Sequence, residues 1–428
     1  DYTIFIACPK YGIMLELMLS KFFLRIKKAR YFWRYASFTE VGILYIARIL
    51  RLLAMNLSSI FILIFLYEIG YSFQFLIFYL IGYYALKVVG AIVGGFYVAK
   101  RGPKHGLLLS NLLYIPMLIV TSMAEEFGLP AVIAGLILQA LSVAIYDLSY
   151  HIDFSKVKDV KSSGKQIGIM YVIEKITGGL APMIGGFLAM TIGAQPVMLI
   201  SAGLFALAAI PLLTSEEPIK TNQKINFYAF PWKNFWRNFT AQIGSGFDVV
   251  SSNIWSLLTP IFIFAGQNVY GVIGVLSSIG AIVGVVAALS YGYFVDRGKG
   301  LKLLQTPVYI KALTLAIRGG FIFSPAGAVA SNLVSESTTT GYNMAYFKGA
   351  FDAADRSGSR IVYMMATMIV EYFTGIIASI IALICLNSFQ IEQNGLRFFL
   401  VLSAIGILMY STADFPLYRK RSRQYKEE

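Results

Sequence analysis

The sequence contains little cysteine, histidine and charge. Its only cysteines, Cys8 and Cys385, are too far apart in the chain to suggest a disulfide framework or a metal-ligand motif. Charged residues make up 14% of the 428 residues, whereas about 25% is usual in a soluble protein. These shortages argue against a secreted disulfide-rich protein, a soluble enzyme and a disordered scaffold.

Motifs of ATP-driven and hydrolytic proteins are absent as well. The sequence has no Gly-x4-Gly-Lys-Ser/Thr phosphate loop, no Gly-x-Ser-x-Gly elbow and no His-Glu-x-x-His zinc motif. Of the two histidines, His105 lies in a basic loop, and His151 with Asp153 offers too few ligands for a metal ion. We therefore expect neither an enzyme nor a bound metal or cofactor.

Long apolar runs, in contrast, are abundant. Hydrophobic residues make up 57% of the chain, and its mean hydropathy is +0.68. Runs of about 18 or more apolar residues predict membrane-spanning helices, because lipid offers the backbone no hydrogen-bond partners. Twelve spans are expected, at 41–67, 73–99, 106–123, 129–150, 165–190, 196–213, 238–264, 270–295, 303–322, 325–346, 360–386 and 397–418.

The spans fall into two groups of six, which are separated by a polar stretch. The first bundle is expected at 41–213, the linker at 214–237 and the second bundle at 238–418. A basic amphipathic arm at 1–40 precedes the bundles, and a basic tail at 419–428 follows them.

The basic residues predict the orientation in the membrane. Most of the 36 Lys and Arg residues fall in loops on the side of the two termini, whereas the opposite loops carry only Arg397. By the positive-inside rule, we expect a multi-pass plasma-membrane protein with both termini cytoplasmic. This orientation explains the net charge of +14 without a nucleic-acid partner.

The two halves repeat each other at an offset of 196 or 197 residues. Residues 95–98 match 292–295, and two further matches, of 146–150 with 342–346 and of 174–178 with 371–375, occur at the same offset. Parallel halves related by an axis along the membrane normal are a transporter architecture. We therefore predict an all-α membrane protein with twelve transmembrane helices in two pseudo-twofold-related six-helix bundles.

These features together resemble the major facilitator superfamily over nearly all of residues 37–418. In that superfamily, the loop between helices 2 and 3 reads Gly-x-Leu-x-Asp-Arg-x-Gly-Arg-Lys. The Asp of this motif contacts a helix N-terminus across the domain interface, where the helix dipole stabilises its negative charge. Here Ala99 replaces the Asp in the first half, whereas Asp296 keeps it in the second half. The resemblance implies a gate at Asp296 near the start of the fifth span, around Lys165, and a weaker latch at 95–104. The gating residues expected from this motif are Gly95, Lys100, Gly102, Lys104, Gly292, Asp296 and Arg297.

The fifth span resembles a motif of the drug–proton antiporters of this superfamily, Gly-x8-Gly-x3-Gly-Pro-x2-Gly-Gly. Its residues here include Gly178, Pro182, Gly185 and Gly186, with the middle glycine shifted by one position and Ala181 in place of the third. The resemblance implies a conformational role for these four residues and an antiporter function. The chain is also similar to uncharacterised superfamily members from small-genome bacteria.

Ionisable residues inside apolar spans cost about 2.5–3.5 kcal/mol each on insertion scales, and they are therefore candidates for substrate or ion binding. Arg48 and Arg51 share one face of the first span. Asp248 is the repeat mate of Arg51, so the two would form a charge pair across the halves or two ends of a substrate site. An anionic group of the substrate is the natural partner of Arg48. Internal ion pairs that join helices are the structural alternative.

Buried carboxylates are the expected means of ion coupling. Glu174 and Glu371 are repeat mates in the fifth and eleventh spans, and we predict that they carry protons. The alternative for Glu174 is a structural pair with Lys87 or Lys311. Further substrate or ion ligands are expected in the fourth and tenth spans, at Asp147, Glu336 and Asn343.

These observations favour a secondary active transporter that works by alternating access. The first hypothesis is proton-coupled efflux of small amphipathic compounds, since aromatic residues make up 15% of the chain. Uptake or flipping of an anionic solute or lipid is the alternative, and a non-transporting membrane receptor or scaffold is a hypothesis of another class. The expected partners are a small-molecule substrate, a proton or other coupling ion and the lipid bilayer, with the protein as a monomer.

Overall fold

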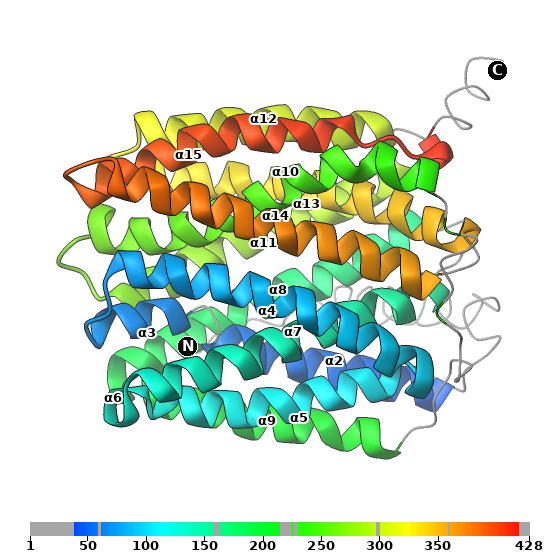
Figure 1. The fold of residues 1–428 in the computed structure, drawn as a ribbon, viewed down its shortest axis with the longest axis horizontal. Helices are drawn as coiled ribbons and strands as arrows, with labels where there is room; N and C mark the ends of the chain where they lie inside the picture. Colours follow the sequence, from blue (N-terminus) through cyan, green and yellow to red (C-terminus); the bar gives the residue numbers. More distant parts are fainter. Residues whose placement is uncertain are drawn as a thin grey trace, which may run out of the picture.

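The computed structural model describes residues 38–58, 61–157, 163–214, 225, 230, 232–296, 300–357 and 360–418. The expected basic tail, nearly all of the expected arm and most of the linker lie outside these residues. Within the described residues, all regular secondary structure is helical, and the long helices run roughly parallel to one another (Figure 1).

The helices before the linker are α2 (Phe38–Ser58), α3 (Ile62–Glu68), α4 (Phe73–Arg101), α5 (Pro103–Ser122), α6 (Ala124–Phe127), α7 (Leu129–Val157), α8 (Ser163–Ile192) and α9 (Ala194–Thr214). The helices after it are α10 (Trp232–Leu258), the π-helical turn η2 (Thr259–Ile263), α11 (Val269–Asp296), α12 (Gly300–Gly320), α13 (Pro325–Arg356), α14 (Arg360–Asn387), α15 (Glu392–Leu408) and the 3-10 helix η3 (Met409–Thr412).

The described residues thus form twelve long helical segments, six on each side of the linker, when α2 is taken with α3, α10 with η2 and α15 with η3. Ten of these segments are long and apolar enough to cross a membrane. The helices α12 and α13 are long enough but more polar, because α12 carries Lys311 and Arg318 and α13 carries Glu336 among serines and threonines. Lys311 and Arg318 are 1% and 2% exposed, so these charges point into the protein rather than toward lipid.

Several helices extend beyond the apolar runs. The helix α10 begins at Trp232, before the span expected from residue 238, and α13 continues to Arg356, past the expected end at residue 346. Trp232 and Trp236 are exposed, whereas Phe235 between them is buried. This arrangement is typical of an amphipathic helix start at a membrane surface, where tryptophan is favoured.

The predicted repeat is visible in the way the helices pack (Figure 1). In the first half α2 packs against α8 and α9, α4 packs against α7, and α5 packs against α7 and α9. In the second half α10 packs against α14 and α15, α11 packs against α13, and α12 packs against α13 and α15. Each contact of one half therefore has its counterpart in the other half, as expected for two pseudo-twofold-related bundles.

Two seams join the halves, one between α4 and α14 and one between α8 and α11. Small residues bring the helices of each seam close together. A Cβ atom on Gly186 would lie 2.6 Å from the carbonyl oxygen of Tyr270, and one on Gly274 would lie 2.8 Å from that of Pro182. Of the glycines in the fifth-span motif, Gly186 therefore faces the other half of the molecule.

The two ends of the bundle differ in how tightly they are packed. We call the end where α9 stops and α10 starts the linker end, and the other the far end. At the far end the Tyr270 hydroxyl donates a hydrogen bond to Glu68, and the Phe61 ring packs edge-on against Tyr270 at 5.4 Å between centroids. Phe73 stacks on Phe262 at 5.4 Å. These contacts join α3 and α4 to η2 and α11, and they hold the two halves together at the far end.

Candidate functional site

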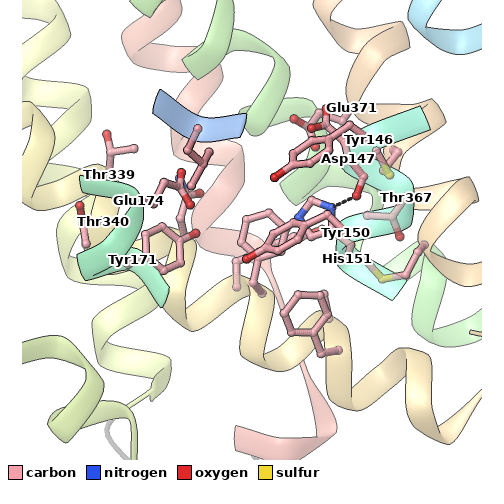
Figure 2. Close-up of a pocket in the computed structure, with 18 of the residues that line it drawn as sticks. Tyr146, Asp147, Tyr150, His151, Tyr171, Glu174, Thr339, Thr340, Thr367 and Glu371 are labelled. Carbon is pink, nitrogen blue, oxygen red and sulfur yellow. Dashed lines mark hydrogen bonds between the residues drawn. The ribbon is translucent and has the colours of Figure 1, made fainter. Parts of the chain in front are cut away.

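A cavity of about 400 Å³ lies between the halves, lined by the linker-end parts of α2, α7, α8, α13 and α14 (Figure 2). It extends to Phe351, near the end of α13, and to Met364, near the start of α14. The polar and charged residues that line it are Arg48, Tyr146, Asp147, Tyr150, His151, Tyr171, Glu174, Lys175, Thr339, Thr340, Asn343, Tyr346, Thr367, Glu371 and Tyr372. Five predicted site residues are thus brought together here, namely Arg48, Asp147, Glu174, Asn343 and Glu371.

Arg48 and Glu174 form an ion pair within the first half. An Nη atom of Arg48 on α2 lies 3.9 Å from a carboxylate oxygen of Glu174 on α8. The guanidinium group also lies over the ring of Tyr150, 3.7 Å from its centroid. Arg48 is therefore held by an anion and an aromatic face at the cavity wall, and Glu174 pairs with Arg48 rather than with Lys87 or Lys311.

A second ion pair joins Lys87 to Asp147 at the α4–α14 seam. The Lys87 Nζ atom donates a hydrogen bond of 3.2 Å to Asp147 on α7. The hydroxyl of Tyr372, on α14 of the other half, donates to the same carboxylate oxygen at 3.1 Å. The Lys87 ammonium group also lies 4.1 Å from the centroid of the Tyr372 ring. Asp147 therefore connects the two halves through Tyr372.

A third ion pair crosses the other seam directly. The Nζ atom of Lys175 on α8 donates a 2.6 Å hydrogen bond to Glu336 on α13. The lysine stem passes over Gly284 of α11, where a Cβ atom would lie 2.8 Å from the stem. The Glu336 side chain is 40% exposed and that of Lys175 is 20% exposed, so solvent reaches this pair.

Glu371 differs from the other acidic residues of the cavity. It lines the wall on α14, and among the described residues it forms no ion pair. Figure 2 shows Glu371 and Asp147 on one side of the cavity and Glu174 on the other. Glu371 is therefore the carboxylate that is most available for a proton or a cationic ligand.

Aromatic rings from both halves form much of the remaining wall. Tyr146 and Tyr150 of α7 lie parallel, at 5.8 Å between centroids and 4° between planes. His151 stacks on Phe347 of α13 at 4.8 Å and 15°, and a nitrogen of its ring lies 2.6 Å from the carbonyl oxygen of Asp147. Flat aromatic faces beside carboxylates suit a ligand that is both apolar and cationic.

The predicted pair of Arg51 and Asp248 does not form, which corrects the expectation from the repeat. Arg51 is 2% exposed and donates hydrogen bonds to Ser110, at 3.1 Å, and to Asn111 of α5. Its guanidinium group lies 3.7 Å from the ring centroid of Tyr146. Tyr146 lines the cavity, whereas Arg51 does not. Arg51 is therefore part of the interior of the first half, because α5 offers it polar partners there.

Asp248 is likewise bound within its own half. The Nζ atom of Lys311 on α12 lies 3.1 Å from its carboxylate, and the Tyr342 hydroxyl donates a hydrogen bond to it. Lys311 also donates to Ser335 at 2.6 Å and to Thr339 at 3.0 Å. Ser335 and Thr339 of α13 therefore bind Lys311, and Thr339 also lines the cavity together with Thr340.

The gating residues of the first-half motif lie at the linker end of the α4–α14 seam. Gly95 faces Met365 of α14, and Lys104 is buried at the start of α5. Gly102 joins α4 to α5 with a φ of 96°, a conformation that favours glycine. Lys100 is exposed. Gly95 thus lies where α4 meets the other half, and the gating role of this motif stays a prediction.

The second-half motif is described only in part. Gly292 is buried in α11, which ends at Asp296. Arg297 and the side chains of Asp296 and Lys165 lie outside the described residues, so the predicted gate stays a prediction. In the fifth-span motif, Gly185 faces α2, whereas Gly186 faces α11.

Three residues of the site escaped the sequence reasoning as functional candidates: Lys175, Tyr372 and His151. Lys175 and Tyr372 are repeat mates at an offset of 197, and each lies at a seam. The adjacency of Lys175 to Glu174 and of Tyr372 to Glu371 was the available signal. The sequence does not reveal their partners. Lys175 pairs with Glu336 and Tyr372 with Asp147, and each partner lies on a helix that is distant in the chain.

Comparisons with known proteins agree with this architecture. The sequence model of the Major Facilitator Superfamily matches residues 44–378. A search of curated protein sequences finds no match.

Among solved structures, the chain is similar to a bacterial homologue of the iron transporter ferroportin in an outward-facing state, with 15% identity and a TM-score of 0.66 over 90% of this chain and 100% of that one. It is similar to the human organic anion transporter MFSD10, with 13% identity and a TM-score of 0.64 over 88% and 99% of the two chains. It is also similar to the fucose:proton symporter FucP of E. coli, with 13% identity and a TM-score of 0.62 over 89% and 98%.

These structures share the fold, at identities too low to indicate a substrate. The family match covers most of the chain, and the paired six-helix halves have the same architecture as these transporters. The chain therefore belongs to the Major Facilitator Superfamily, whose members are membrane transporters and not enzymes.

Proposed function

We propose that this protein is a secondary active transporter that exports small amphipathic cations in exchange for protons. The observation that carries the proposal is the position of Glu371, a carboxylate at the cavity wall with no ion pair among the described residues. A proton or the positive charge of a substrate would each neutralise it. Competition between the two for one carboxylate couples their movements in opposite directions.

The charge balance of the cavity supports this exchange. Arg48 and Lys175 line the cavity and pair with Glu174 and Glu336, and the lining residue Asp147 pairs with Lys87. Glu371 is the lining carboxylate that has no ion pair among the described residues. An isolated charge in a membrane protein is costly, so one positive charge is favoured at Glu371.

The aromatic walls support an amphipathic rather than a strongly hydrated substrate. The cavity contains the parallel pair Tyr146 and Tyr150 and the stacked pair His151 and Phe347. Such faces attract organic cations through the ring quadrupole and bury apolar surface at the same time.

The packing of the two ends supports alternating access. The cavity lies at the linker end, while Tyr270, Glu68 and the aromatic contacts join the halves at the far end. We infer that the linker end is cytoplasmic in a bacterial inner membrane, that both termini lie there and that the protein works as a monomer. The division into bundles at 41–213 and 238–418 then supplies the two bodies that rock against each other.

The test is transport in proteoliposomes that carry a pH gradient, with a lipophilic aromatic cation as the substrate. Glu371→Gln keeps the size and hydrogen bonding of the side chain but cannot exchange a proton. We expect this variant to lose gradient-driven transport and the proton flux that substrate induces. Glu392→Gln is the matched control, because Glu392 is an exposed carboxylate at the far-end start of α15. Proton-coupled transport that persists in Glu371→Gln would refute the proposal.

A second candidate is transport of an anionic solute or lipid, and Arg48 is the observation that favours it. Its distance of 3.9 Å from Glu174 is long for an ion pair, so an anionic substrate could compete with Glu174 for the guanidinium group. Transport of an anionic amphiphile that is lost in Arg48→Gln and retained in Glu371→Gln would favour this candidate.

A non-transporting receptor is the candidate of another class. It would tolerate neutralisation of Glu371 and Arg48 without a change in ligand response, since it needs no proton exchange. The same proteoliposomes distinguish a receptor from a transporter. With the wild-type receptor, neither the aromatic cation nor the anionic amphiphile would accumulate, although ligand binding would remain measurable.

A further inference from the structure

Arg397 is a buried arginine whose guanidinium group has no polar partner among the described residues. It lies in the second turn of α15, near the far end, and is 5% exposed. Its Nε, Nη1 and Nη2 atoms are all buried and donate no hydrogen bond to the described part of the chain. The guanidinium carbon lies 3.9 Å from the centroid of the Phe323 ring.

The other buried arginines show that this is a property of the site. Arg51 donates hydrogen bonds to Ser110 and Asn111, and Arg318 donates to Ser331 and Asn332. A buried guanidinium group without acceptors is strongly destabilising, because five N–H donors and a full charge have lost water. An acceptor from outside the described residues is therefore needed at Arg397.

The depth of Arg397 in the membrane indicates where this acceptor comes from. The candidate membrane span that includes α15 begins at Glu392. Arg397 is thus about 7–8 Å below the start of the span, at 1.5 Å of rise per residue. An arginine side chain bridges that depth by extending toward the membrane surface, where the phosphate groups of lipids lie.

Exposed aromatic rings lie in the two connections at this end of the molecule. Phe321 and Phe323, in the loop between α12 and α13, are 81% and 65% exposed. Phe389, in the turn between α14 and α15, and Phe398, in the second turn of α15, are 40% and 44% exposed, with 5.5 Å between their ring centroids. Both connections lie at the far end (Figure 1). In a bilayer these rings would contact the glycerol and upper acyl region of a lipid.

We propose that Arg397 binds the phosphodiester group of an anionic phospholipid in the leaflet at the far end. The planar guanidinium group can donate to two phosphate oxygens at once. The Phe323 ring lies in a loop, so it can move aside for the headgroup without disturbing a helix, while Phe321 and Phe389 contact the chains. Arg397 is the one basic residue expected in the far-end loops, and the nearby Arg318 already donates hydrogen bonds to Ser331 and Asn332.

The experiment is native mass spectrometry of the purified full chain, titrated with phosphatidylglycerol in detergent. A digalactosyl lipid with the same acyl chains is the control ligand that lacks a phosphate group. Inorganic phosphate is the control ligand that lacks acyl chains. We expect one phosphatidylglycerol to be retained by the wild-type protein. Arg397→Gln should weaken this retention about tenfold, which corresponds to about 1.4 kcal/mol.

Lys302→Gln is the matched control, because Lys302 is an exposed basic residue at the other end of α12. It should bind the lipid as the wild type does. Equal retention of phosphatidylglycerol by the wild type and Arg397→Gln would overturn the proposal. So would equal binding of the digalactosyl lipid, or saturation of the site by inorganic phosphate alone.

A second variant keeps the test decisive if Arg397→Gln gives little folded protein. Arg397→Lys retains the charge but loses the planar fork that binds two oxygens. It should show partial loss of phosphatidylglycerol retention, and added phosphatidylglycerol should raise its thermal stability less than that of the wild type. Unchanged retention together with an unchanged thermal shift would overturn the proposal.

Discussion

Arg51 and Asp248 occupy the same place in the two halves, and each contacts the equivalent tyrosine of its own half. Arg51 lies over the ring of Tyr146, and Asp248 accepts a hydrogen bond from Tyr342, which is the repeat mate of Tyr146. The third position of this cluster is Tyr114 in the first half and Lys311 in the second. The two halves therefore share the geometry of a polar cluster, although its first position is a cation in one half and an anion in the other.

The buried pair of Asp248 and Lys311 should contribute to folding rather than to transport. Their side chains are 8% and 2% exposed. Removing one partner by Lys311→Met leaves a buried carboxylate uncompensated, and we expect a loss of about 3–5 kcal/mol of stability. The double variant Asp248→Asn with Lys311→Met should recover much of this loss. Thermal unfolding in detergent measures the stability of the single and the double variant. A double variant that is no more stable than Lys311→Met would contradict the prediction.

The pair of Lys175 and Glu336 should instead affect the balance between conformations. Because solvent reaches it, we expect it to contribute only about 0–1 kcal/mol to folding. Since it joins the halves, Lys175→Gln should shift the population toward states in which α8 and α13 are further apart. Distances between spin labels at the linker ends of α7 and α13 report this shift. The charge swap Lys175→Glu with Glu336→Lys should restore the wild-type distribution, and failure to do so would exclude the pair as the cause.

Close packing at the α8–α11 seam should make Gly186 intolerant of a larger side chain. A Cβ atom there would lie 2.6 Å from a backbone oxygen of Tyr270, whereas one on Gly203 meets nothing within 4 Å. We expect Gly186→Ala to destabilise the protein by about 1–3 kcal/mol. Gly203→Ala should be neutral or stabilising by about 1 kcal/mol, because alanine favours a helix. Equal melting temperatures for the two variants would show that the seam opens more easily than the structure indicates.

Glu174 should behave differently from Glu371, although the two are repeat mates. Glu174 pairs with Arg48, whereas Glu371 forms no ion pair among the described residues. We expect Glu174→Gln to keep the pH dependence of transport and to change the apparent substrate affinity, since it leaves Arg48 without its anionic partner. Transport rates measured as a function of pH and of substrate concentration separate the pH dependence from the apparent affinity. Loss of pH dependence in Glu174→Gln would assign proton exchange to both residues.

The sequence by itself determined the fold. Apolar runs of membrane length leave the backbone no choice but helices, and the recurrence of motifs at one offset fixed the two-fold plan of the helices. Both are properties of consecutive residues. For the same reason the sequence identified the charges inside the spans and the glycines of the fifth span.

The partners of those charges were decided only by the tertiary structure. Symmetry alone favoured a pair of Arg51 with Asp248, yet Ser110 and Asn111 lie nearer to Arg51 and Lys311 lies nearer to Asp248. Similarly, Lys175 follows Glu174 in the chain but reaches Glu336, because neighbouring residues on a helix point about 100° apart. Which charge neutralises which depends on how helices from distant parts of the chain cross, and that arrangement leaves Glu371 without an ion pair in the described cavity.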